Sequence, residues 1–492
     1  MCKFYCLIQN ICVTLHQIRA FMDIQLTYHR RQTTNTNVGG LLIGSEHPIR
    51  IQTMANTSTN DIEGSVAQAK RCVEAGAELV RFTTQGLREV ESLAQIHKEL
   101  CSIVQNGKGL NSIVPLVADV HFQSDVADAA AKVVEKVRIN PGNYIDPARK
   151  FKQIDYTDEE YQAELQRLRT RFVQLLDICK EHKTALRIGV NHGSLSDRIM
   201  SRYGDTPEGM VESCMEFLRV AVAEDFKDIV LSIKASNTRV MVTTVRLLVW
   251  QMAEEGMMFP LHLGVTEAGE GEDGRVKSAV GIGALLADGI GDTIRVSLSE
   301  APEKELPVAR ALVEYFADNQ SIRYANDTQV RVEGNTIRYS NADSDWATFQ
   351  LHAAAECGRL LWDYNCTELV LNNNHFPAED LQRLSKDILQ AARVRMYKTE
   401  YISCPGCGRT LFDLEQTIAQ VKAATSHLQG LKIGIMGCIV NGPGEMADAD
   451  YGYVGAGRGK VSLYRGKECV LKNIPQEEAV EQLLELIKKE SK

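Results

Sequence analysis

Eight short runs rich in β-branched and other apolar residues alternate with helical stretches between residues 49 and 317, and this rhythm strongly constrains the fold. The stretches between them, such as "DIEGSVAQAKRCVEAGA", repeat apolar residues every three or four positions, as amphipathic helices do. The runs are "IRIQTMAN" (49–56), "ELVRFTTQ" (78–85), "IVPLVADVHF" (113–122), "KVRINPGN" (136–143), "ALRIGVNHGSL" (185–195), "DIVLSIKAS" (228–236), "PLHLGVTEAG" (260–269) and "DTIRVSLSE" (292–300).

Eight strand–helix units in about 270 residues predict an α/β fold built on a (β/α)8 TIM-type barrel. An open doubly wound sheet is the alternative. Such a sheet often carries a glycine-rich fingerprint after its first strand, and "IQTMANTSTND" has no such pattern. The barrel is therefore the favoured fold for this part of the chain.

Beyond the barrel the pattern changes twice. Residues 318–400 predict a short α/β spacer with a hairpin, two helices and a strand, and residues from 401 onward predict a small α+β domain. We interpret residues 1–21 as a tail, with Met22 as an alternative start. The expected domains are a tail at 1–28, the barrel at 29–318, the spacer at 319–398 and the last domain at 399–492.

Composition excludes several classes of protein. A net charge of −9 and a pI near 5.8 argue against nucleic-acid binding, which usually requires a basic face. No run of 18 apolar residues predicts a membrane-spanning helix. The 13 cysteines are odd in number and scattered through apolar contexts, which favours buried thiols in a reducing cytoplasm over a disulfide scaffold.

Polar side chains gather where the predicted barrel strands end. Residues two apart on a strand point the same way, and the ends of barrel strands carry the chemistry of this fold. Arg or Lys occurs in five of the eight strands, whereas we count only two acids at equivalent points. The residues concerned are Arg81, Thr83, Asp119, His121, Arg138, Asn140, Arg187, Asn191, Lys234, Glu267, Arg295 and Ser297.

A buried cation is costly unless it is paired, so this excess of cations predicts an anionic ligand such as a phosphate or diphosphate. The alternative is that the arginines face outward, or that they pair with loop acids such as Asp197 or Glu270. Asp119 and His121 could form an acid/base or metal pair, and Glu267 could serve as a general acid or base.

Three cysteines lie among glycines and prolines in the last domain, in "SCPGCGRT" and "MGCIVNGPGE". Cys404, Cys407 and Cys438 could form a redox pair with a third thiol, a zinc site completed by His427 or Cys469, or an iron–sulfur site. The Gly-Pro-Gly turn after Cys438 brings Glu445 close, and a carboxylate would be an exchangeable ligand for iron. We place the cluster ahead of zinc.

The blocks "RIQTMANTSTND", "VRINPGN", "IGVNHGSLSDR", "VTEAGEG", "CPGCGRTLFDL" and "GCIVNGPGE" resemble the signature blocks of one family. It is the 4-hydroxy-3-methylbut-2-enyl diphosphate synthase family (IspG, also called GcpE) of the non-mevalonate isoprenoid pathway. The resemblance runs in order over residues 29–318 and 391–489. It implies reductive ring opening of 2-C-methyl-D-erythritol 2,4-cyclodiphosphate to the linear allylic diphosphate.

The resemblance also implies roles for particular residues. A [4Fe-4S] cluster would be ligated by Cys404, Cys407, Cys438 and Glu445, with Asn441 beside it. Asp119, His121 and Glu267 would line the reacting end, with Glu267 as the candidate proton donor. The diphosphate would be bound by Arg81, Arg138, Asn140, Arg187, Asn191, Lys234, Arg295 and Ser297.

The implied partners are ferredoxin or flavodoxin as electron donor and a second copy of the chain, as a cytoplasmic homodimer without nucleic acid or membrane. "KTEYISCPGCGRTLFDLEQT" resembles the long form of the family, yet residues 318–400 are too few for its large insert. The alternative function is a barrel enzyme for another phosphorylated or pterin-like substrate with a structural zinc domain. A non-catalytic, zinc-stapled interaction module is the third hypothesis.

Overall fold

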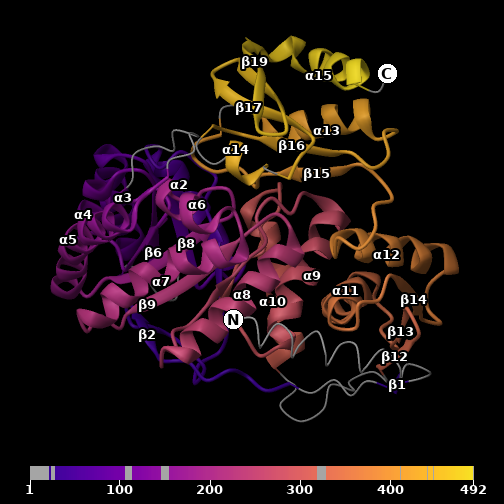
Figure 1. The fold of residues 1–492 in the computed structure, drawn as a ribbon, viewed down its shortest axis with the longest axis horizontal. Coiled ribbons are helices and arrows are strands. Elements are labelled where there is room, and N and C mark those ends of the chain that lie inside the picture. The colour runs from indigo at the N-terminus through magenta and orange to yellow at the C-terminus, as the bar shows by residue number, and fades with distance from the viewer. Residues whose placement is uncertain are drawn as a thin grey trace.

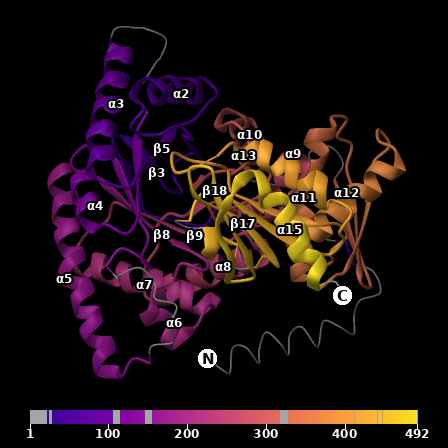
Figure 2. The same cartoon turned by 90° about the horizontal axis from the view of Figure 1, so that it is seen from above.

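The computed structural model describes residues 22–23, 28–105, 114–145, 155–317, 328–410, 412–439, 442–446 and 448–490. Three larger sheets and one small hairpin divide the chain. In Figure 1 the barrel runs from indigo to rose, the orange middle domain lies beside it, and the yellow C-terminal domain lies above. Figure 2, seen from above, shows the C-terminal domain overlying the barrel.

Eight parallel strands form the barrel in the order β10-β11-β4-β5-β6-β7-β8-β9. A parallel bridge between Leu231 of β9 and Leu261, directly before β10, closes the ring between the two ends of this order. The TIM-type barrel expected from the sequence is confirmed. The strands are β4 (Arg50–Met54), β5 (Leu79–Thr84), β6 (Leu116–Val120), β7 (Lys136–Ile139), β8 (Ala185–Asn191), β9 (Ile229–Lys234), β10 (His262–Leu263) and β11 (Thr293–Ile294).

Helices surround the barrel, and several begin at residues that cap them. Before α5, the Thr157 side chain accepts a hydrogen bond from the Glu160 N–H, and the Glu160 carboxylate accepts one from the Thr157 N–H. The helices are α2 (Ile62–Glu74), α3 (Leu87–Gln105), α4 (Ser124–Ala130), α5 (Asp158–His182), α6 (Asp197–Tyr203), α7 (Pro207–Ala223), α8 (Thr238–Glu254), α9 (Gly271–Ala287), the 3-10 helix η1 (Pro302–Lys304) and α10 (Glu305–Ala317).

A hairpin of β2 (Thr36–Val38) and β3 (Leu41–Ile43) covers the N-terminal end of the barrel. Val38 and Ile43 are fully buried against four apolar side chains at the strand starts, namely Leu79, Val117, Ala185 and Val230. This apolar layer closes one end of the barrel. The polar interior therefore faces the opposite, C-terminal end, where barrel enzymes carry their active sites.

The middle domain has a four-stranded sheet in the order β1-β12-β13-β14, covered by two helices. The hairpin expected in "TQVRVEGNTIRYS" is present, and Met22–Asp23, within the expected tail, pairs with it. Helix α11 packs closely on α9. A Cβ added at Gly283 of α9 would lie only 2.5 Å from Ala355 Cβ of α11. The elements are β1 (Met22–Asp23), β12 (Gln329–Glu333), β13 (Thr336–Ser340), α11 (Trp346–Asp363), β14 (Glu368–Asn372) and α12 (Ala378–Ala391).

The C-terminal domain is a five-stranded sheet in the order β15-β16-β17-β18-β19 with its own core. The expected "NGPGE" turn is one short helical turn, α14. The elements are β15 (Glu400–Ser403), α13 (Leu414–Thr425), β16 (Lys432–Met436), α14 (Gly442–Glu445), β17 (Tyr451–Gly457), β18 (Lys460–Arg465), β19 (Glu468–Pro475) and α15 (Gln476–Glu490). A membrane-crossing helix is absent from the described ranges, where every helix is too short or too polar.

Candidate active site

A cavity of about 710 Å³ lies between the C-terminal end of the barrel and the C-terminal domain of the same chain. The barrel contributes Met54, Arg81, Asp119, His121, Arg138, Asn191, Lys234, Thr266, Glu267, Arg295 and Ser297. The C-terminal domain contributes Cys404, Pro405, Gly406, Cys407, Arg409, Thr410, Met436, Gly437, Cys438 and Gly442.

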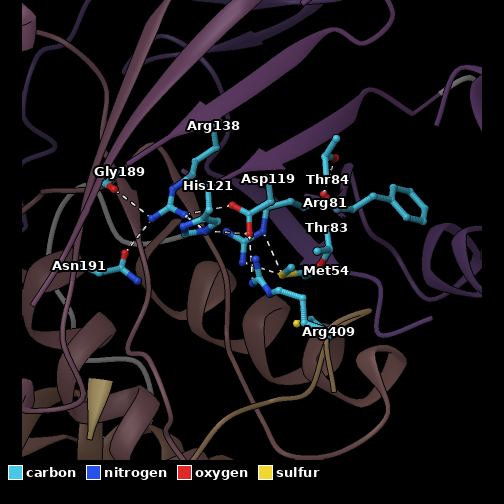
Figure 3. A network of polar contacts seen from close by, with 12 residues as sticks. Met54, Arg81, Thr83, Thr84, Asp119, His121, Arg138, Gly189, Asn191 and Arg409 are labelled. Carbon is cyan, nitrogen blue, oxygen red and sulfur yellow. Dashed lines mark hydrogen bonds and ion pairs between the residues drawn. The ribbon is translucent and has the colours of Figure 1, made fainter. Parts of the chain in front are cut away.

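Arg138 organises the barrel side of the cavity (Figure 3). Its Nη1 donates to Asp119 Oδ1 at 3.2 Å and to His121 Nε2 at 2.5 Å. Its Nη2 donates to the Gly189 carbonyl and to Asn191 Oδ1, each at 2.9 Å. Since His121 Nε2 accepts from a guanidinium, the imidazole proton belongs on Nδ1.

The surroundings of Asp119 and His121 fix their charge states. Burial alone raises the pKa of Asp119, but Arg81, Arg138 and His121 outweigh it and hold that pKa well below its usual range. Burial, reinforced by Arg138, lowers the pKa of His121 to about 3. The pair is therefore an ionised carboxylate beside a neutral imidazole, so His121 is not a cation at neutral pH.

Two further arginines come together around the sulfur of Met54. Arg81 donates to Met54 Sδ from Nη2 at 2.7 Å, and Arg295 from Nη1 at 3.4 Å. Arg295 also forms a buried ion pair with Glu305, with Nη2 and Oε1 3.0 Å apart. Glu305 begins α10 and was not counted among the acids in the sequence, so one cation is offset by a carboxylate outside the strands.

Cations still exceed carboxylates in this part of the described chain. Lys234 lies 5% exposed on the cavity wall with no carboxylate within ion-pair distance among the described residues, and Arg81 lacks one too. Burial and then Arg81 lower the pKa of Lys234 well below its usual range. The arginines Arg81, Arg138, Arg187, Arg295 and Arg409 keep their charge, and with Lys234 they face the described carboxylates Asp119, Glu267 and Glu305. A dianionic ligand would offset this imbalance.

Glu267 lies on the cavity wall with Thr266, in the turn that follows β10. Its backbone has a φ of +50°, in the left-handed region that non-glycine residues seldom adopt. Phe122, next to His121, has a φ of +65°. Such strained residues gather at functional sites, where the surrounding fold holds a side chain in a required direction.

Two residues expected in the site do not line the cavity. Asn140 is 1% exposed, and its Oδ1 accepts a hydrogen bond from the Gly142 N–H at 3.1 Å, so it supports the loop after β7. Arg187 is also 1% exposed and lies one layer deeper, two residues before Gly189 on β8. The other nine barrel residues given a role in the expected site line the cavity. Thr83, counted only among the polar side chains at the strand ends, is buried outside the cavity with Oγ1 lacking a described partner.

The three cysteines come from neighbouring loops of the C-terminal domain. Strands β15 and β16 are parallel neighbours, so Cys404 and Cys438, which follow their ends, lie at the same edge of the sheet. The Gly437 N–H donates to Cys404 Sγ at 3.2 Å, and the Cys407 N–H donates to Thr410 Oγ1 at 3.0 Å. All three cysteines line the cavity, opposite the cationic barrel end.

This donor set fits an iron–sulfur cluster better than a single ion. Three thiols with glycines Gly406, Gly437 and Gly442 between them form a soft, open cradle. Asn441 and the Glu445 side chain lie outside the described residues, so the fourth ligand stays a prediction.

Arg409 is a cavity residue that the sequence interpretation missed. It lies two residues after Cys407, and its Nη2 is 3.6 Å from Asp119 Oδ2 on β6 (Figure 3). Its side chain is 8% exposed. The signal was available in "CPGCGRT", where a cation directly follows the cysteine pair, but only the fold shows that it reaches the barrel.

The C-terminal domain is held on its own barrel by polar and close backbone contacts. Ser299 Oγ lies 2.9 Å from Ser403 Oγ, and Lys277 Nζ lies 3.0 Å from Glu400 Oε1. Gly193 approaches α14 so closely that a Cβ there would lie 2.2 Å from the Gly444 carbonyl oxygen. Both halves of the cavity therefore come from one chain.

Comparison with known proteins agrees with this architecture. The GcpE TIM-barrel domain matches residues 33–310, and the GcpE protein C-terminal domain matches residues 400–489. The chain is 48% identical to a Bacteroides fragilis protein named 4-hydroxy-3-methylbut-2-en-1-yl diphosphate synthase (flavodoxin), covering 95% of this chain and 97% of that protein.

A protein of the same name from Leptospira interrogans is 38% identical, covering 94% of this chain and 97% of that protein. The alignment with the Bacteroides fragilis protein runs over 613 positions, against 492 residues here, so well over a hundred positions of that relative have no counterpart in this chain. These identities and the two matched domains show that the chain belongs to the GcpE family.

Proposed function

We propose that this chain is a 4-hydroxy-3-methylbut-2-en-1-yl diphosphate synthase. It opens the ring of 2-C-methyl-D-erythritol 2,4-cyclodiphosphate reductively in the non-mevalonate isoprenoid pathway. The observation that carries this function is a single cavity with an excess of cations on one wall and three cysteines on the other, in a chain 48% identical to a protein of that name.

The barrel residues bind and orient the diphosphate. Arg81 and Lys234 have no described carboxylate partner, so they offer the strongest attraction to the phosphate oxygens. Arg138 is held rigidly by four acceptors and presents a fixed edge. Asn191, Arg295 and Ser297 complete the wall, while Arg187 and Asn140 support it from behind.

Cys404, Cys407 and Cys438 would hold a [4Fe-4S] cluster, with Glu445 as the fourth ligand and Asn441 beside it. When bound, such a cluster supplies electrons one at a time to the carbon–oxygen bond that breaks. The Gly437 N–H at Cys404 Sγ lowers the negative charge on that sulfur. The closed contact between the two domains keeps bulk water away from the reacting end.

Ring opening consumes two electrons and two protons and releases one water, so the site must deliver protons to the leaving oxygen. Glu267, on the cavity wall, is the candidate proton donor. The neutral His121 keeps its proton on Nδ1, and Asp119 stays ionised, so both orient Arg138 and Arg409. Neither of these two side chains is a source of protons at neutral pH.

Flavodoxin or ferredoxin would donate the electrons in the cytoplasm. The name of the relatives supports flavodoxin. A homodimer, also expected from the resemblance, is not required to complete the cavity, since one chain supplies both walls. We infer that the positions missing from this chain belong to the long-form insert, of which residues 319–398 are the reduced remainder.

Anaerobic purification with iron, sulfide and zinc analysis tests the proposal. We expect about four irons and four sulfides per chain, with a brown chromophore that dithionite bleaches and the cyclodiphosphate reoxidises. The matched control is Cys469→Ser, a cysteine of the same domain that lies outside the cavity, where its thiol contacts the Leu471 carbonyl and Tyr464. One zinc without sulfide would favour the alternative, a barrel enzyme for another phosphorylated or pterin-like substrate.

A further inference from the structure

A second layer of cationic side chains lies beneath the cavity, inside the barrel. Residues two apart on a strand share a face, so Lys136 of β7 points into the barrel below Arg138. His262 lies on β10, whose strand end leads to the cavity residue Thr266. Lys136 is 0% exposed, and Arg187 and His262 are each 1% exposed. None of the three lines the cavity itself.

The polar atoms of this layer lack partners among the described residues. Lys136 Nζ, Arg187 Nε and Nη1, and His262 Nε2 are buried without a hydrogen-bond acceptor or donor. His262 Nδ1 has only Thr293 Oγ1, at 3.4 Å. No carboxylate of the described chain reaches Lys136, whose charged neighbours are Arg187 and Arg81.

An unpaired ammonium in such a place is costly, and two neighbouring guanidinium groups raise that cost. Burial, then Arg187 and Arg81, lower the pKa of Lys136 well below its usual range. Arginine keeps its charge far more firmly than lysine. In the ligand-free protein, Lys136 is therefore the member of this layer that gives up its proton, while Arg187 stays charged.

We propose that Lys136 takes up a proton from solvent when the cyclodiphosphate binds in the cavity above it, so that substrate binding is coupled to proton uptake. Lys136 is a positioning residue, since it stands one layer below the cavity wall and acts through Arg138 and Arg187. The proposal rests on the proposed function, because it requires a dianionic ligand in that cavity.

The charge balance supports this coupling. Each phosphorus of the cyclodiphosphate carries one ionisable oxygen, and both are ionised far below neutral pH, so the ligand itself neither gains nor loses a proton. Two negative charges placed above the layer offset the positive potential of Arg187 and Arg81 at Lys136 and so favour its protonated form. The amine nitrogen then gains one proton, and no bond to the ligand forms or breaks.

Calorimetric titration of the cyclodiphosphate into the full chain tests the coupling. The protein is purified anaerobically and kept without reductant, so that the ligand is bound but not turned over. Binding enthalpies in two buffers of different ionisation enthalpy give the number of protons taken up. We expect Lys136→Met to take up about one proton fewer per bound ligand than the wild type near pH 7.5.

Three further variants make the result decisive. Lys132→Met, an exposed lysine four residues away, is the matched control and should keep the full uptake. Lys136→Arg stays charged in the free protein and should likewise take up about one proton fewer than the wild type, which keeps the test valid if Lys136→Met fails to fold. Uptake equal to that of the wild type in either Lys136 variant, or a loss of one proton in His262→Gln instead, overturns the proposal.

The outcomes also separate this inference from the proposed function. A wild-type protein that does not bind the cyclodiphosphate would contradict the proposed function. A wild-type protein that binds it without proton uptake would leave that function standing and overturn only the role of Lys136.

Discussion

Arg409 of the C-terminal domain and Asp119 of barrel strand β6 form an ion pair across the cavity, with Nη2 and Oδ2 3.6 Å apart. The other oxygen of the same carboxylate accepts from Arg138 at 3.2 Å. One buried acid thus holds two arginines from two domains. Asp119 offsets part of the charge that Arg409 brings to the cationic wall, and a bound anion would offset more of it, so ligand binding and domain contact support each other.

Replacing Arg409 tests this relationship. We expect Arg409→Gln to weaken binding of the cyclodiphosphate by about 10- to 100-fold, because a hydrogen bond to a charged group contributes about 1.5–3 kcal/mol. The affinity of Arg409→Lys for the cyclodiphosphate should lie between those of Arg409→Gln and the wild type, since lysine keeps the charge but loses the planar guanidinium group. Equilibrium titration without reductant measures the effect.

The control for this prediction is Arg458→Gln, which removes the same charge from an exposed position of the same domain. Its affinity should equal that of the wild type. Equal losses of affinity in Arg409→Gln and Arg458→Gln would mean that the effect comes from net charge alone. The contact between Arg409 and Asp119 would then contribute nothing to ligand binding.

The rhythm of strands and helices was sufficient to predict the barrel and its polar end. Residues two apart on a strand, such as Asp119 and His121, were placed on one wall by the period of the strand alone. Charge pairing was harder to predict. Glu305 pairs with Arg295 from the start of a helix, and Arg409 reaches Asp119 from another domain, 290 positions along the chain. No local pattern encodes such contacts, because they depend on how the domains pack.

The sequence also did not predict how deep in the barrel each inward-facing side chain lies. Arg138 and Arg187 occupy similar strand positions and are paired in register, yet only Arg138 reaches the cavity. The stagger of barrel strands decides which residues share a level, and stagger is not visible in a strand taken alone. The sequence therefore predicted which residues point inward but not which of them lie at the surface of the cavity.

Completion of the cavity within one chain leads to a complementation test. Cys407→Ser and Arg138→Gln each damage one wall, and both walls belong to the same chain. A mixture of the two variants, unfolded and refolded or co-expressed, should therefore show no activity above the two separate variants. If the walls came from two subunits, random mixing would restore about a quarter of the wild-type activity.

The wild type treated in the same way is the control for that mixture, and its recovered activity sets the scale. Size-exclusion chromatography with light scattering gives the oligomeric state of each sample. Recovery near a quarter of that scale would contradict closure of the C-terminal domain on its own barrel, which rests on contacts such as Ser299 with Ser403.

The lowered pKa of His121 predicts that the folded protein loses stability as the pH falls below about 6.5. The folded-state pKa of His121 is lowered to about 3, first by burial and then by Arg138, whereas an unfolded histidine binds a proton below about pH 6.5. Its contribution to stability is therefore complete above pH 6.5 and is lost as the pH falls toward 3. Each pH unit in that window costs about 1.4 kcal/mol of unfolding free energy.

Urea unfolding at pH 7.5 and pH 5.5 checks this sign. The loss of unfolding free energy between the two values should be about 1 kcal/mol smaller in His121→Gln than in the wild type. His97 is the matched control, because its hydrogen bond with Glu135 raises its pKa. His97→Gln should lose more stability at pH 5.5 than at pH 7.5, and the same trend in both variants would contradict the assignment.

Glu445 is the proposed fourth ligand of the iron–sulfur cluster, and its replacement tests that role directly. Three thiolates can hold a four-iron cluster, and a carboxylate at the fourth corner is an exchangeable ligand, since its hard oxygen binds iron less firmly than sulfur does. We expect Glu445→Ala to keep the brown chromophore and the iron content, while turnover of the cyclodiphosphate falls by at least about tenfold.

Cys438→Ser should lose the chromophore itself. Glu415→Ala, an exposed acid of the same domain, should match the wild type in both respects. Full turnover in Glu445→Ala, measured with the same iron content, would exclude Glu445 as the fourth ligand.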